Sequence, residues 1–128
     1  MQSKEIIKES GRPIRFRAWN VNTKRMADWE EVENEYGFKY LLGNNITIPM
    51  QYTGLKDKNG VEIYEGDVIT YQEGPPKMRA KVVWKNGGFV FAYEDGIENI
   101  TSESWYAPMD VEITEVIGNI YQNPELLT

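Results

Sequence analysis

Residues 53–71, TGLKDKNGVEIYEGDVITY, decide the fold of this 128-residue chain, because they hold two glycine-bearing turns between short β-type runs. The first turn, residues 57–60, contains the pair Asn59-Gly60, which accepts a left-handed backbone and therefore predicts a hairpin between antiparallel strands. In the second turn, residues 65–67, Gly66 allows a close reversal, and Asp67 can accept hydrogen bonds from nearby backbone donors. Together the turns are expected to fix strand register in the sheet that follows.

Further strands are predicted on both sides of this stretch by alternating apolar and polar residues. The runs with this period lie at residues 14–19, 46–52, 67–72 and 80–84, followed by one apolar face at Phe89, Phe91 and Tyr93. A second Asn-Gly pair, Asn86-Gly87, predicts another tight hairpin. Turn signals recur about every ten residues, as is typical of a small antiparallel sheet or barrel.

The end of the chain combines a strand with a short helical turn. In the run 111–121 the apolar parity changes between Ile113 and Val116, which predicts a bulge near Glu115. Asn123 at an N-cap, followed by proline and glutamate, predicts one helical turn whose two leucines cover the core.

A chain of this length can bury one hydrophobic core of ordinary size. We expect a flexible extension at residues 1–12, a β-rich lobe at 13–52, and a barrel region at 53–128 that forms one compact unit with the lobe.

Cysteine and histidine are absent from the sequence. Disulfides, thiolate chemistry and every mechanism that needs a histidine base are therefore excluded, and metal binding would depend on carboxylates. The first residues lack the apolar stretch of a secretory signal, and no apolar run is long enough to span a bilayer. We therefore expect a cytoplasmic protein without a cofactor.

The net charge of −6 is unevenly distributed. Residues 49–128 carry 13 acidic against 6 basic side chains, and no lysine or arginine follows Lys85. Because basic groups supply most of the affinity for nucleic acid, this half is expected to repel a duplex.

Three segments resemble the YopX-like family, small uncharacterised proteins of phages and prophages of Gram-positive bacteria. They are IRFRAW at residues 14–19 followed by Met26, QYTGLKDKNGVEIYEGDV at residues 51–68, and EVIGNIYQNPELL at residues 115–127. The resemblance covers about residues 13–127. It implies a mainly β fold whose second half is a small SH3-like barrel, and it implies no activity or catalytic residue. Its turn residues, structural and open to a functional role, are Gly54, Asp57, Asn59, Gly60, Tyr64, Glu65, Gly66 and Asp67.

Our first functional hypothesis is a non-enzymatic accessory protein that binds a phage or host protein through an aromatic surface. Aromatic residues make up 12% of the chain, and tryptophan and tyrosine are enriched at binding hot spots. The candidate aromatics are Trp19, Trp29, Trp105 and Tyr106, although the area that such side chains bury favours a core position for each.

An alternative is a carboxylate-dependent enzyme that uses magnesium on a nucleotide or phosphate ester. The acids around the two turns, Asp57, Glu62, Glu65 and Asp67, could hold a divalent ion. The plainer interpretation is that Asp57 and Asp67 cap their turns while the two glutamates face water.

A second alternative is a weak binder of single-stranded nucleic acid. The stacking platforms would be Tyr52, Tyr64, Tyr71 and Phe89, and the basic groups would be Arg12, Arg15, Arg17, Lys24 and Arg25. The acidic balance of the chain weighs against it. Self-association is also expected if Pro49 marks an exposed edge strand.

Overall fold

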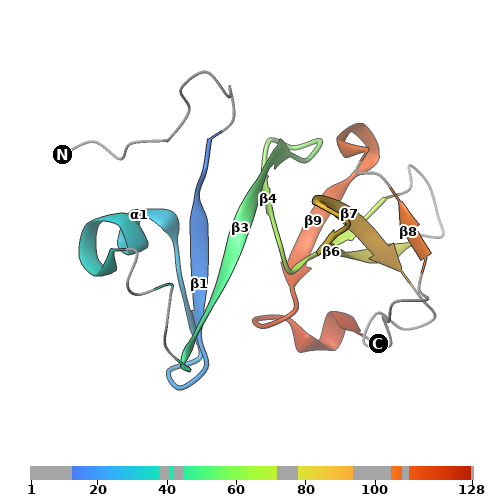
Figure 1. Ribbon diagram of the computed structural model, residues 1–128. Helices are drawn as coiled ribbons and strands as arrows, with labels where there is room; N and C mark the ends of the chain where they lie inside the picture. The colour runs from blue at the N-terminus through green and yellow to red at the C-terminus, as the bar shows by residue number, and fades with distance from the viewer. Residues whose placement is uncertain are drawn as a thin grey trace. The chain divides into compact units, whose positions relative to one another are not determined.

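The computed structural model describes residues 13–37, 41, 45–71, 78–93, 105–107 and 110–127. The chain divides into two compact units, Met1–Gly54 and Leu55–Thr128. It is mainly β, with two antiparallel sheets and short helical turns, so the predicted fold class is confirmed (Figure 1).

The strands are β1 (Phe16–Asn20), β2 (Arg25–Ala27), β3 (Thr47–Lys56), β4 (Glu62–Tyr64), β5 (Asp67–Thr70), β6 (Arg79–Lys85), β7 (Gly88–Tyr93), β8 (Trp105–Ala107) and β9 (Glu115–Asn119). The helical segments are α1 (Trp29–Glu31), the π-helical turn η2 (Val32–Tyr36), and the 3-10 turns η4 (Val111–Ile113) and η5 (Pro124–Leu127). Within the described residues, no helix has the length and apolar character that a membrane crossing requires.

The first unit is built on β1, which pairs antiparallel with β2 and with β3. Asp28 begins α1 as its N-cap, because its carboxylate accepts the N–H of Glu31 at 2.9 Å. One face of the strands then meets the helix in a small core of Ala18, Ala27, Trp29, Val32 and Leu41.

The first sheet has the strand order β2-β1-β3-β4. Pro49 lies in β3 opposite Ala18 of β1. Because β3 stands between β1 and β4 in this order, Pro49 does not mark an edge strand. Proline has no backbone N–H, so β3 offers no ladder donor at this position.

The second unit contains the five-stranded sheet β8-β7-β6-β5-β9, which curls into a half-barrel (Figure 1). Its inner face packs into a core of Ile63, Ile69, Ala80, Val82 and Phe91. The predicted hairpin between β6 and β7 is confirmed, since Asn86 and Gly87 take φ values of 53° and 83° and Lys85 lies opposite Gly88. This is the backbone that a two-residue turn between twisted strands requires.

A bulge interrupts the pairing of β9 with β5, as the change of apolar parity predicted. Val68 lies opposite Gly118 and Ile69 lies opposite Val116, so Ile117 is the extra residue. The bulge is thus two residues beyond Glu115. It turns Val116 toward the core and Gly118 toward the outer face of the sheet.

The predicted C-terminal helical turn is present as η5. Leu126 lies directly over Gly118, and the guanidinium of Arg79 donates a hydrogen bond to the Leu126 carbonyl at 3.2 Å. The turn therefore covers the outer face of its own sheet at β9 and β6.

Candidate functional site

The turn at residues 57–60 is organised by the carboxylate of Asp57, which is only 6% exposed. Its Oδ1 accepts the N–H of Asn59 at 2.8 Å and the N–H of Val61 at 2.9 Å. Gly60 then takes a φ of 81°, which a side chain would strain. The sequence Asp-Lys-Asn-Gly thus builds a turn whose own backbone donors are satisfied by its first residue.

The same carboxylate also reaches a strand that is distant in sequence. Its Oδ2 accepts the N–H of Val116 in β9 at 2.9 Å, across 59 residues of chain. Beside it, the N–H of Lys58 donates to the carbonyl of Thr114 at 3.1 Å. Thr114 is fully buried, and its hydroxyl donates to the carbonyl of Asp110 at 2.6 Å. The hydrogen bonds of Asp57 and Lys58 therefore anchor the start of β9 to the first turn.

Hydrogen bonding determines the ionisation of this carboxylate. Burial alone would raise the pKa of Asp57, but the N–H groups of Val116, Val61 and Asn59, helped by the charge of Lys58, lower it below its ordinary value of 3.8. Donors aimed at a carboxylate favour its charged form. Asp57 is therefore ionised at neutral pH and serves as an acceptor.

This lowered pKa predicts how stability depends on pH. Because the pKa of Asp57 is lower in the folded than in the unfolded chain, its contribution is fully present above the ordinary value of 3.8 and is lost as pH falls through the folded value. In urea unfolding at a series of pH values, the stability gap between wild type and Asp57→Asn should narrow below about pH 4. A gap that stays constant down to pH 2, measured in the same way, would contradict this assignment.

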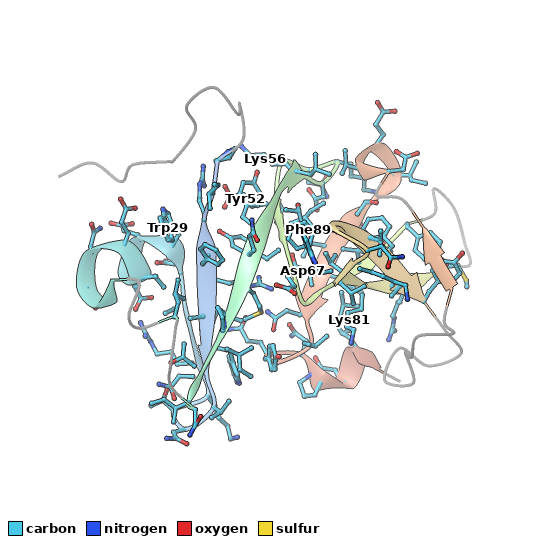
Figure 2. All side chains as sticks on the ribbon, viewed as in Figure 1. Trp29, Tyr52, Lys56, Asp67, Lys81 and Phe89 are labelled. Carbon is cyan, nitrogen blue, oxygen red and sulfur yellow. The ribbon has the colours of Figure 1, made fainter. Side chains whose placement is uncertain are left out.

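The second turn, at residues 65–67, connects three segments through Gly66. The N–H of Gly66 donates to the carbonyl of Val82 at 2.9 Å, and its carbonyl accepts the N–H of Ile120 at 3.0 Å. Gly66 has a φ of 87°. Glycine takes this conformation without strain because it has no Cβ atom, whereas other residues would be strained there. Asp67, 1% exposed, accepts the N–H of Tyr64 at 2.8 Å through Oδ2 (Figure 2). The turn therefore holds β6 and the end of β9 in place.

The remaining turn residues lie around these two acids. Gly54 has a φ of 88° within β3, and Asn59 is exposed. Tyr64 is 8% exposed, and its hydroxyl donates to Glu62 at 3.3 Å. Glu65 is half-buried and lies near Tyr121. Burial of the Tyr121 phenol is the larger cause that raises its pKa, and the negative charge of Glu65 raises it further.

The geometry does not gather the four acids into a chelating group. Asp57 accepts backbone N–H groups of its own turn and of Val116 in β9, Asp67 accepts the N–H of Tyr64, and Glu62 accepts from a phenol. In the part of the chain that the structure describes, no three acidic side chains lie close enough to hold a metal ion.

The candidate aromatics have different positions. Trp19 is 8% exposed and Trp29 is 9% exposed, with Trp29 in the core of the first unit beside Phe16 (Figure 2). The side chains of Trp105 and Tyr106 lie outside the described residues. A buried indole offers no surface to a partner, so Trp19 and Trp29 contribute packing in this structure.

Trp84 is the exposed aromatic that the sequence analysis missed. In the alternating run 80–84, Trp84 shares one face with Ala80 and Val82, which are buried, but Trp84 is 53% exposed. Its ring meets Phe89 edge-on, with 4.9 Å between centroids and an interplanar angle of 77°. Its place at the end of a strand, next to a tight hairpin, is the signal that could have identified it.

Several of the residues that the nucleic-acid hypothesis requires are buried or paired with another side chain. Tyr52 is 3% exposed and lies under the guanidinium of Arg15, whose central carbon is 5.3 Å from the ring centroid. Arg25 forms an ion pair with Glu31. The stacking platform Tyr64 is also buried, and Arg12 lies outside the described residues.

Two antiparallel sheets, one of them curled into a half-barrel, and two turns whose buried acids accept backbone hydrogen bonds define a small β protein. The family model described as "YopX protein" matches residues 33–128, and the chain therefore belongs to the YopX family. The resemblance inferred from the sequence is confirmed.

Two solved structures are similar over almost the whole chain. The protein EF1440 from Enterococcus faecalis is 27% identical, with a TM-score of 0.62, and the match covers 91% of this chain and 99% of that one. The yopX protein from Bacillus subtilis is 22% identical, with a TM-score of 0.53, and the match covers 89% and 98%. The second likeness shows the fold alone. None of the curated proteins matches the chain.

Proposed function

We propose that this chain is an accessory protein of phage or prophage origin that acts by binding another protein and not by catalysis. The observation that supports binding is Trp84, 53% exposed at the end of β6 and held against Phe89. Tryptophan is among the residues most enriched at binding hot spots. The phage origin rests on the family resemblance, as does the SH3-like character of the half-barrel.

The aromatic pair is held in a fixed position before any partner arrives. Trp84 lies directly opposite Phe89 in the β6–β7 ladder, two residues from the turn at Asn86 and Gly87. An edge-to-face pair of this kind is worth about 0.5–1.5 kcal/mol beyond its buried area. A partner therefore meets a rigid aromatic surface and loses little conformational entropy in ordering it.

The absence of a catalytic role is supported by the chemistry of the polar residues. The chain has neither histidine nor cysteine, and the buried acids Asp57 and Asp67 accept backbone hydrogen bonds. An acceptor that is committed to the scaffold is a poor proton carrier, because protonation would break the turn it holds.

The test is capture of crosslinked partners from lysate of the host bacterium with tagged wild type, Trp84→Ala and Val61→Ala. Val61 is a matched control, since it is 46% exposed and apolar but lies directly after the first turn. We expect specific partners with wild type and Val61→Ala, and at least a tenfold lower yield with Trp84→Ala, as for a hot-spot residue. Equal recovery from all three proteins would refute the aromatic surface.

A further inference from the structure

The tripeptide Lys-Asn-Gly occurs twice in the chain, and each copy lies in a tight turn. One copy is residues 58–60, in the first turn, and the other is residues 85–87, between β6 and β7. The asparagine and the glycine are exposed in both copies. The immediate neighbours of the two asparagines are therefore the same, and the folded backbone is what distinguishes the two sites.

An asparagine followed by glycine can lose its side-chain amide without an enzyme. The glycine N–H gives up its proton, the nitrogen attacks Cγ of the asparagine, and ammonia leaves as a cyclic succinimide forms. Water then opens the succinimide at either carbonyl, which gives aspartate or isoaspartate. No electrons are transferred, and water is the only co-reactant. Glycine favours the reaction because it has no Cβ atom to hinder the approach, so the fold controls it through access to the glycine N–H.

In the first turn this N–H group is held in a hydrogen bond. The N–H of Gly60 donates to the backbone carbonyl of Asp57 at 3.0 Å. On either side of it, the Asp57 carboxylate accepts the N–H of Asn59 at 2.8 Å and the N–H of Val61 at 2.9 Å. Removal of the Gly60 proton would break a hydrogen bond and place an anion beside an ionised carboxylate, which repels it. The first turn therefore protects Asn59.

The turn between β6 and β7 has no such bonds. Neither the N–H of Gly87 nor the side chain of Asn86 has a hydrogen-bond partner among the residues that the structure describes. In a two-residue turn the strands close through the flanking pair, here Lys85 and Gly88, and the N–H of the second turn residue is left to water. Because the turn is at the tip of a hairpin, it need open only locally for Cγ of Asn86 to reach the Gly87 nitrogen.

From this difference we infer that Asn86 is a site of spontaneous deamidation by water, whereas Asn59 is protected by the turn that Asp57 organises. The reaction belongs to the turn itself and needs no partner protein.

The modification also reaches the exposed aromatic pair. In isoaspartate the chain runs through the side-chain carboxyl carbon, so the backbone of the turn is longer by a carbon atom. Because turn length fixes hairpin register, the alignment of Lys85 with Gly88 is lost. Trp84 and Phe89 are the next pair along the ladder, so isoaspartate at position 86 disturbs their edge-on contact.

The test is incubation of the full chain in a mildly alkaline buffer, followed over time by peptide mapping with mass spectrometry. The mass gain from amide to carboxyl is measured at Asn59 and Asn86 in the same sample. We expect Asn86 to react at least about tenfold faster than Asn59 in the folded protein, because a protected amide reacts only after its turn opens. In enough urea to unfold the chain, the two rates should agree within about twofold, since both sites then have the same immediate neighbours.

Amide hydrogen exchange measured by NMR checks the cause, with fast exchange expected at Gly87 and slow exchange at Gly60. The variant Asn86→Asp separates the two products, because it carries the new charge on a backbone of ordinary length and aspartate tolerates a positive φ. The indole N–H signal of Trp84 should shift in the isoaspartate fraction and stay near its wild-type position in this variant.

Three results would overturn the inference: equal rates at the two asparagines in the folded protein, a faster reaction at Asn59, or reaction at Asn86 only in urea. An unchanged Trp84 signal in the isoaspartate fraction would refute the effect on the aromatic pair.

Discussion

Replacement of Asp57 by alanine is expected to lower the free energy of unfolding by about 3 kcal/mol, because buried donors left without an acceptor cost about 1–3 kcal/mol each. Three backbone N–H groups lose their acceptor at once, those of Asn59, Val61 and Val116. The loss from the first two opens the turn, and the loss from the third releases the start of β9. Urea unfolding followed by circular dichroism at neutral pH measures the change.

The matched control is Asp110→Ala. Asp110 also accepts a backbone N–H, from Glu112 at 3.2 Å, but it is exposed and serves one local turn. Its loss should cost less than about 1 kcal/mol, since water replaces the acceptor. Asp57→Asn, which retains an acceptor oxygen without the charge, should lie between the two. If Asp57→Ala were no more destabilising than Asp110→Ala, the link between the first turn and β9 would carry no stability.

Local signals in the sequence were sufficient to predict most of the second unit. Asn86-Gly87 predicted a turn because both residues accept positive φ, and the structure has that turn. The parity change in β9 predicted a bulge because the side-chain period of a strand is two. Its position was off by two residues, at Ile117, because parity shows that a residue is inserted and not which one.

Contacts that are long-range in sequence were not predictable in the same way. The acids near the two turns suggested a metal site, but the partner of Asp57 in β9 is a backbone N–H, which has no signature in the sequence. Trp84 illustrates a second limit. Alternation assigns a residue to a face, whereas exposure depends on how far the core extends beneath it, and the core ends before Trp84.

The second large effect is expected at Gly118, where alanine should lower the free energy of unfolding by about 2–3 kcal/mol through overpacking. A Cβ atom there would lie 2.5 Å from Oδ1 of Asn123 and 2.7 Å from Cδ1 of Leu126. Asn123 cannot move aside freely, because the same Oδ1 accepts the N–H of Asn119 at 3.1 Å. The η5 turn should therefore separate from the sheet, and limited proteolysis should cut between residues 120 and 127.

Gly88→Ala is the matched control for this change, because it places the same methyl group on a strand where nothing lies within 4 Å. Its stability should differ from wild type by less than about 0.5 kcal/mol, as at surface positions without special contacts. Truncation of Asn123 to alanine in the Gly118→Ala background should restore part of the loss, since residues in contact couple by about 0.5–3 kcal/mol. Additive losses in the double variant would mean that the methyl group and Asn123 do not collide, and the destabilisation would then come from the contact with Leu126.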